Sequence, residues 1–185
     1  MCLEPERWEG CNGLAGLRAL YFGRFQPFHN GHLYALKWLL ERYDEVIILI
    51  GMASESHTYR NPFTAGERAE MIESVINWLG IDWRRVKIAS MPTLEVYSGF
   101  SLYVLHMFPR VDCVATANGS VASAFKHAGV KVVMPPLLER EKLRGEYIRM
   151  LIARGVKDWE DLVPLPVREF LIRIRAPERL RQIIG

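Results

Sequence analysis

Short apolar runs alternate with longer segments of helical periodicity along most of this 185-residue chain. Residues 17–22 are apolar and end at Gly23, while residues 45–50 are β-branched and fully apolar in their second half. Both runs are typical of strands that are buried in a parallel sheet. Three shorter apolar runs predict further strands at 86–89, 111–115 and 131–133.

Apolar residues with helical spacing lie between these runs. One stripe runs from Leu33 to Tyr43, and a second, over residues 71–79, follows Thr64-Ala65-Gly66-Glu67, which matches a capping box. Further helices are expected at 100–108, between the last two strands, and from residue 145 to the end of the chain. Because strand and helix alternate throughout, the sequence predicts an α/β fold with a doubly wound parallel sheet and C-terminal helices.

The composition favours one domain. Residues 1–16 are polar and Gly-rich without periodicity, so we interpret them as an N-terminal extension and residues 17–185 as a single domain. No apolar run approaches the ~20 residues that span a bilayer, and no secretory signal is visible. The three cysteines lack metal-type spacing and are expected to be reduced thiols of a cytoplasmic protein, with Cys113 in the core.

The charge balance is mild. There are 24 Lys and Arg residues against 21 Asp and Glu, which gives a net charge of +3. This excess is too small to indicate a nucleic-acid partner, and nothing points to a membrane. It would suit a local site for anionic phosphates.

Residues 23–32, Gly-Arg-Phe-Gln-Pro-Phe-His-Asn-Gly-His, join the first strand to the first helix. In doubly wound sheets ligands bind outside the carboxyl ends of the strands, so this segment should line the crevice. His29 and His32 are three residues apart across the helix start, where helix amides and the dipole favour anions. Arg24 adds a planar charge. Together these groups predict a triphosphate site.

This segment also has alternative interpretations. Two histidines at this spacing could bind zinc, but no further ligand cluster is evident in the sequence. Gly23 and Gly31 permit close approach of the backbone, although a glycine at a strand-to-helix turn alone means little. The segment is neither a Walker loop nor the Rossmann glycine fingerprint.

The same segment resembles the H-x-G-H signature of the nucleotidyltransferase superfamily. In the form GRFQPFHNGH it is similar to the archaeal nicotinamide-mononucleotide adenylyltransferase family. The resemblance continues through residues 56–58 and 61–68, returns more weakly at 158–164 and 178–181, and so runs from about residue 17 to the C-terminus. It implies a Rossmann-like nucleotidyltransferase domain.

In that family the 5′-phosphate of nicotinamide mononucleotide attacks the α-phosphorus of ATP, pyrophosphate leaves, and NAD forms. The resemblance implies that His29 and His32 contact the ATP phosphates and that His32 steadies charge on the α-phosphate. Arg24 and Arg60 would hold phosphates, and Arg149 would grip the β- and γ-phosphates. Mg²⁺ would arrive with ATP and bridge its phosphates, with no protein side chain expected as a metal ligand.

The resemblance also implies further contacts and an assembly. Additional ATP contacts fall on Gly23, Phe25, Gly31 and Asn118, and acceptor contacts fall on Gly51, Ser54, Tyr97 and Phe100. The small-molecule partners would be ATP and nicotinamide mononucleotide. A homo-oligomer is expected, because the family often forms hexamers.

For several of these residues a purely structural role is the alternative. Arg60 and Arg149 could be solvated surface arginines, and Asn118 could simply start a helix. Glu67 and Arg68 are expected to be cap and helix-surface groups rather than catalytic ones.

The chain departs from the family pattern in a second signature, roughly Ser-Gly-Thr-x-Ile-Arg. The matching residues are Arg144-Gly145-Glu146-Tyr147-Ile148-Arg149, so two hydroxyl groups are missing, and Glu146 would repel a phosphate if it pointed inward. Tyr97 and Phe100 stand where the family usually has asparagine and tryptophan. Two alternatives therefore stay open: a nucleotidyltransferase with another phosphate acceptor, and a nucleotide-binding regulator that has lost catalysis.

Overall fold

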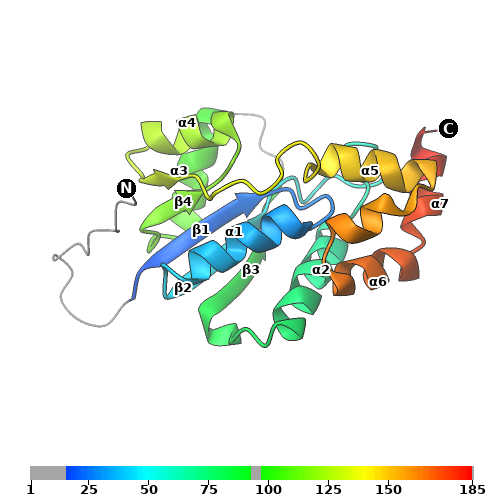
Figure 1. Cartoon of the computed structure of the whole chain (residues 1–185). Coiled ribbons are helices and arrows are strands. Elements are labelled where there is room, and N and C mark those ends of the chain that lie inside the picture. The colour runs from blue at the N-terminus through cyan, green and yellow to red at the C-terminus, as the bar shows by residue number, and fades with distance from the viewer. Residues whose placement is uncertain (1–15, 93–96, 185) are drawn as a thin grey trace.

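A five-stranded parallel sheet forms the centre of the computed structural model, which describes residues 16–92 and 97–184 (Figure 1). Its strands are β1 (Arg18–Gly23), β2 (Glu45–Ile50), β3 (Val86–Ser90), β4 (Cys113–Ala115) and β5 (Val132–Val133). Their order is β3-β2-β1-β4-β5. The chain thus extends the sheet first on one side of β1 and then on the other, which confirms the predicted doubly wound, Rossmann-like fold.

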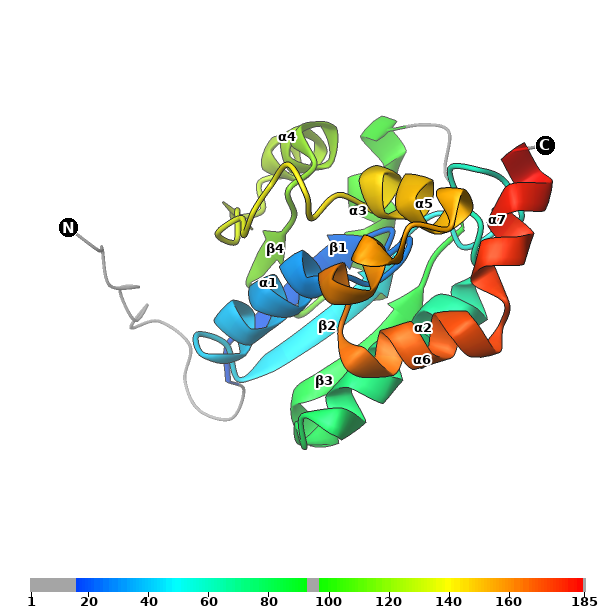
Figure 2. The ribbon, with the colours of Figure 1, turned by 45° about the vertical axis from the view of Figure 1, so that its right-hand side comes forward.

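Helices cover both faces of this sheet (Figure 2). They are α1 (Asn30–Leu40), α2 (Ala65–Trp78), α3 (Tyr97–Met107), α4 (Gly119–His127), α5 (Gly145–Arg154), α6 (Leu165–Arg173) and α7 (Ala176–Ile184), with short 3₁₀ turns η1 (Trp83–Arg85) and η2 (Lys157–Leu162). One face packs against α1, α2 and the C-terminal helices, and the other packs against α3 and α4.

Alternation of side chains along β2 builds the two cores. Val46, Ile48 and Ile50 belong to the core under α1 and α2, whereas Ile47 and Leu49 belong to the core under α3 and α4. Successive strand side chains point to opposite faces, so a strand covered on both sides is apolar throughout. This explains the continuous apolar run of the sequence.

Some predicted boundaries are wrong by a few residues. The helix predicted at 100–108 begins at Tyr97 and ends at Met107. The strand predicted at 111–115 is shorter, Cys113–Ala115, and just before it the Asp112 carboxylate accepts the Arg18 amide at 2.6 Å. The C-terminal helical region is divided, and its first helix ends at Gly155 in the left-handed conformation.

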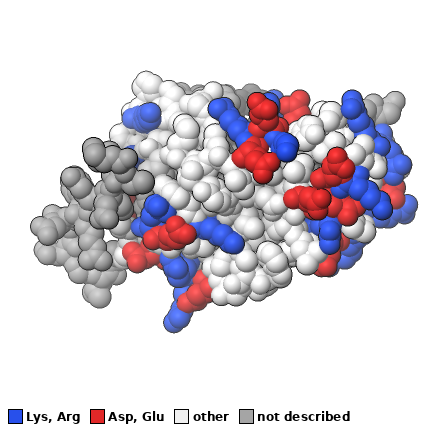
Figure 3. Space-filling view, viewed as in Figure 1, with Lys and Arg blue, Asp and Glu red and all other residues white. Residues whose placement is uncertain are grey.

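Other predictions about the chain have mixed outcomes. Cys113 is buried in the core, as expected. The predicted extension 1–16 lies outside the described residues except for Gly16. No helix in the described ranges is long and apolar enough to cross a bilayer. On the face shown in Figure 3, basic and acidic side chains are interspersed rather than gathered into a field of one sign.

An ion pair joins the start of α2 to the last helix. The predicted capping box is present, since Thr64 Oγ1 accepts the Glu67 amide at 3.1 Å and Glu67 Oε2 accepts the Thr64 amide at 2.8 Å. Arg179 of α7 binds both carboxylate oxygens of Glu67 at 2.7 Å. Although burial favours the neutral carboxyl, these hydrogen bonds hold the pKa of Glu67 below its usual value. Helix α7 is thereby fastened to the first turn of α2.

Removing this pair should destabilise the fold. We expect Arg179→Met and Glu67→Gln each to lower the free energy of unfolding by about 2 kcal/mol, because each leaves a half-buried charge or polar group unpaired. The double variant should lose less than the sum of the two. Urea unfolding would measure these losses, with Arg181→Met on the exposed face as a control; strictly additive losses would contradict the coupling.

Candidate active site

A pocket of about 590 Å³ opens at the carboxyl edge of the sheet, where the strand order reverses. Its walls come from the segments that follow all five strands and from the starts of α1 and α5. This is the place predicted for the ligand of a doubly wound sheet, and the volume suits a nucleotide-sized molecule.

Most residues predicted for the site line this pocket. These are Gly23, Arg24, Phe25, His29, Gly31, His32, Gly51, Arg60, Phe100, Asn118 and Arg149. Ser54 lies outside the lining residues. Tyr97 begins α3, but its side chain lies outside the described part of the structure.

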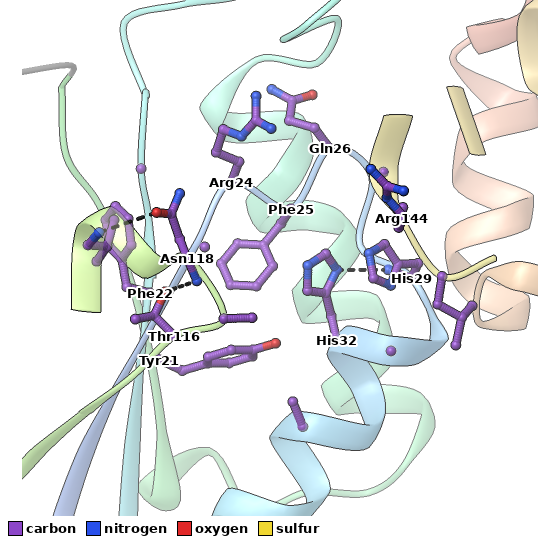
Figure 4. Close-up of a pocket in the computed structure, with 18 of the residues that line it drawn as sticks. Tyr21, Phe22, Arg24, Phe25, Gln26, His29, His32, Thr116, Asn118 and Arg144 are labelled. Atoms are coloured by element: carbon purple, nitrogen blue, oxygen red, sulfur yellow. Dashed lines mark hydrogen bonds between the residues drawn. The ribbon is translucent and has the colours of Figure 1, made fainter. Parts of the chain in front are cut away.

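The two histidines stack on each other at the start of α1 (Figure 4). His29 is the N-cap residue, and its ring centroid lies 3.6 Å from that of His32, with the planes 24° apart. The His29 amide donates to His32 Nδ1 at 3.2 Å. Because Nδ1 accepts this bond, a neutral His32 ring carries its proton on Nε2.

Both imidazoles are neutral at physiological pH. Burial lowers the pKa of His29 to about 3, and burial together with the neighbouring His29 lowers the pKa of His32 well below its usual value. The pair can therefore offer neutral N–H donors to an anion. Positive charge in the pocket comes from arginines and from the helix N-terminus.

A glycine and a buried aromatic ring fix the positions of the histidines. A Cβ atom at Gly31 would lie 3.1 Å from His29 Nδ1, so a larger residue would crowd the imidazole. Phe25 is buried behind the pair, with its ring centroid 4.9 Å from that of His32. The Phe25 ring thus supports the pocket from the core side.

Arg149 is buried and aimed at the same pocket. It is 3% exposed, so the surface alternative is wrong for this residue, whereas Arg60 is exposed at the pocket wall. Arg149 Nη1 donates to the Gln26 carbonyl at 2.7 Å, and the Arg149 guanidinium carbon lies 5.5 Å from the Tyr59 ring centroid. Burial and the nearby charge of Arg24 lower the pKa of Arg149 to about 10, so it is still a cation at pH 7.

Three residues that line the pocket each have a buried nitrogen atom without a hydrogen-bond partner among the described residues: Arg24 Nη1, His29 Nδ1 and Arg149 Nε. Buried polar atoms are nearly always satisfied in folded proteins. Their grouping on one cavity, beside the start of α1, is the arrangement expected for an anionic ligand.

Asn118 caps α4 on the opposite wall. Its Oδ1 accepts the amides of Ser120 at 3.0 Å and Val121 at 3.2 Å, so the helix-start interpretation is correct (Figure 4). Thr116 Oγ1 accepts the Asn118 amide at 3.2 Å. Because Asn118 Oδ1 accepts the cap hydrogen bonds, the Nδ2 group is the part of the side chain that can donate to a ligand.

Phe100 is 8% exposed, less open than an aromatic platform for a ligand base would be. It packs edge-to-face on Phe22, with ring centroids 5.1 Å apart, and on Phe125, at 5.5 Å. Phe22 also lines the pocket, and a Cβ atom at Gly51 would lie 2.6 Å from its ring. Phe22, which the sequence did not single out, therefore shares the aromatic wall with Phe100.

Comparison with known proteins identifies the family. The sequence model of the cytidylyltransferase-like family matches residues 20–151. A Saccharolobus solfataricus protein named nicotinamide-nucleotide adenylyltransferase is 47% identical, over 91% of this chain and 97% of its own. One of the same name from Ignicoccus hospitalis is 42% identical, over 90% of this chain and 98% of its own. This chain belongs to the nicotinamide-nucleotide adenylyltransferase family.

Solved structures share the fold of this adenylyltransferase-family chain. A bifunctional NMN adenylyltransferase/ADP ribose pyrophosphatase from Francisella tularensis superposes with a TM-score of 0.77 at 19% identity. The match covers 92% of this chain but only 53% of that longer chain. A second structure of that protein, with a TM-score of 0.74, is complexed with AMP and a manganese ion.

The residues that depart from the adenylyltransferase signature lie in the pocket. Arg144 is the N-cap residue of α5, Glu146 lies in its first turn, and both line the cavity. A Cβ atom at Gly145 would lie 2.8 Å from the Gln26 carbonyl oxygen, so glycine lets α5 approach the loop after β1. Burial lowers the pKa of Arg149, and the charge of Glu146 is among those that oppose the shift.

Two residues that hold the site together differ from the sequence prediction: Gln26 is not among the predicted site residues, and Arg68 is predicted to lie on the helix surface. The Gln26 side chain pairs with the Phe63 backbone, donating from Nε2 to the carbonyl at 2.9 Å and accepting the amide at Oε1 at 3.0 Å. Arg68 is fully buried, so its predicted place on the helix surface is wrong. Its spacing from Ile72, four residues on, puts it on the apolar stripe of α2, which is the signal that could have revealed it.

The described residues contain no cluster of three or more His, Cys, Asp or Glu side chains that could hold a metal ion. Of the residues that line the pocket, Glu146 is the acidic one.

The burial of His29 should make the stability depend on pH. Below about pH 6.5 His29 binds a proton in the unfolded chain but not in the folded protein. The contribution of His29 to the free energy of unfolding is therefore fully present above about pH 6.5 and is lost as the pH falls toward 3. We expect His29 to account for about 2 kcal/mol of the stability lost between pH 7 and pH 5.

Urea unfolding at the two pH values measures this effect. The loss should be smaller by about that amount in His29→Gln. The same substitution at exposed His106 should leave the loss unchanged, and equal losses in the wild type and His29→Gln would contradict the assignment.

Proposed function

We propose that this protein transfers AMP from ATP to nicotinamide mononucleotide, forming NAD and pyrophosphate. The observation that carries the proposal is the convergence of Arg24, His29, His32 and Arg149 on one cavity at the start of α1. Such a set suits a polyphosphate, since neutral and cationic N–H groups bind its oxygens. The names of the relatives support the choice of substrates.

The reaction needs positioning rather than a covalent enzyme intermediate. An oxygen of the acceptor 5′-phosphate attacks the α-phosphorus, the bond to the bridging oxygen breaks, and pyrophosphate leaves with that oxygen. His32 Nε2–H donates to an α-phosphate oxygen as its charge rises. Arg24 and Arg149 stabilise the charge that gathers on the leaving pyrophosphate.

ATP enters as its complex with a divalent ion, for which we propose Mg²⁺. The pocket wall is rich in cationic and neutral donors and has Glu146 as its acidic residue, which fits an ion carried by phosphates better than one held in a protein cage. The manganese ion and AMP in the Francisella tularensis structure support the use of a divalent metal.

For the acceptor base we propose the aromatic wall beside Gly51, where Phe22 is the more open ring and Phe100 supports it from behind, and Arg60 stays proposed as an ATP-phosphate contact. The changed residues Arg144 and Glu146 favour a second candidate, a nucleotidyltransferase with another phosphate acceptor.

Three further points stay predictions: that the protein is a homo-oligomer, that this oligomer is the hexamer of the family, and that the protein is cytoplasmic.

Product formation tests the reaction directly. We expect the purified protein to form NAD and pyrophosphate from ATP, nicotinamide mononucleotide and Mg²⁺. His32→Ala should lower kcat by about 100-fold or more, because one donor to the transition state is lost, while His106→Ala should leave it unchanged. Pyrophosphate release with a different acceptor would establish the second candidate, and ATP binding without turnover on any acceptor would indicate a regulator.

Glu146 should weaken ATP binding through its charge. We expect Glu146→Thr, which restores a hydroxyl to the signature, to lower the KM for ATP by about three- to fivefold, with a larger effect at low ionic strength. Glu139→Thr changes the same charge outside the pocket lining and should leave the KM unchanged. A raised KM in Glu146→Thr would instead show that the carboxylate assists the metal-bound phosphates.

A further inference from the structure

Arg68 of α2 lies beneath the pocket and outside its lining residues. The side chain is 0% exposed. Its guanidinium donates to four backbone carbonyls, those of Arg24 (2.9 Å), Gly51 (2.7 Å), Met52 (3.0 Å) and Thr64 (3.1 Å). One planar group therefore contacts three separate segments of the chain.

Two of these segments form different parts of the pocket. The Arg24 carbonyl belongs to the loop after β1, which bears the histidines, and Gly51 and Met52 belong to the loop after β2. Thr64 caps the helix that carries Arg68. The side chain thus fixes the loop after β1 and the loop after β2 relative to the same helix.

The backbone at both contacts is in an uncommon conformation. Phe25 has a φ of 54° and Met52 a φ of 53°. Residues with a Cβ atom rarely adopt this left-handed region, and surrounding structure must hold them there. Each of these residues directly follows a carbonyl that Arg68 binds, so the guanidinium acts at the peptide planes that set the two turns.

The cation also keeps its charge. Among the described residues no carboxylate lies within ion-pair distance of Arg68, although the charges of Glu55 and Glu67 act on it from farther away, and its direct partners are backbone carbonyls. Burial, followed by the nearby Arg24, lowers its pKa to about 10, so it is protonated at pH 7. A positive charge under the pocket adds to the potential that attracts a polyphosphate.

We propose that Arg68 is a positioning residue that sets the loops after β1 and β2 in mutual register, so that ATP and the acceptor meet in line. This inference rests on the proposed function. Arg68 touches neither substrate in this arrangement; it acts through the backbone of Arg24 and Met52.

The structure offers a matched control. Arg85 likewise binds backbone carbonyls, those of Leu40, Tyr43 and Asp44, at and just after the end of α1 and away from the pocket lining. Arg85→Ala and Arg85→Lys should lower stability through lost carbonyl contacts. They should leave ligand affinities within about twofold of the wild type, since no pocket loop moves.

Arg68→Lys keeps the charge but cannot bind the carbonyls in one plane. We expect the Kd of Mg²⁺-bound α,β-methylene-ATP, measured by calorimetry on folded protein, to rise about tenfold, and the KM values for both substrates to rise similarly. A merely structural role would reduce the fraction of folded protein and leave Kd and KM unchanged. That result, or an equal effect in Arg85→Lys, would overturn the proposal.

Chemical rescue provides a second measurement. Millimolar ethylguanidinium should restore analogue binding to Arg68→Ala by about fivefold or more and should not improve binding in Arg85→Ala. If Arg68→Ala is insoluble, Arg68→Lys carries the test alone. Because the analogue reports ATP binding without turnover, failure of NAD synthesis would contradict the proposed function and would leave the result on Arg68 separate.

Discussion

Backbone carbonyl groups, rather than carboxylates, surround the buried guanidinium groups at the carboxyl edge of the sheet, and the rest of the site depends on this choice. Arg149 binds the Gln26 carbonyl, and Arg68 binds four others. A carboxylate partner would neutralise the charge, and an incoming phosphate would have to displace it. Carbonyl dipoles stabilise the cation and leave its net charge to act on the ligand.

The stacked histidines at the start of α1 are neutral, for electrostatic reasons. Two imidazolium ions with ring centroids 3.6 Å apart would repel each other, and burial disfavours both charges. The neutral rings instead offer directional donors, and the His29 amide sets the tautomer of His32. The pocket thus separates two tasks, because arginines supply charge and histidines supply geometry.

Local pattern predicted most of the fold and much of the site. Apolar strands, helical stripes and the Thr64–Glu67 box depend on neighbours in sequence, and the loop after β1 had to lie at the carboxyl edge once the sheet was parallel. The sequence could not show that Arg68 turns inward, since its carbonyl partners lie on loops up to 44 residues away. Nor could it show that Phe22 shares the wall with Phe100, because that contact depends on how α3 packs on the sheet.

The Glu67–Arg179 ion pair joins positions 112 residues apart, one beside the pocket loops and one in the last helix. During synthesis the sheet and its first helices leave the ribosome long before Arg179 does. Until Arg179 is present, the first turn of α2 lacks this ion pair. Because Leu171, Ala176 and Leu180 also belong to the core under α1 and α2, that core and the contact at the first turn of α2 are both completed by residues that are made last.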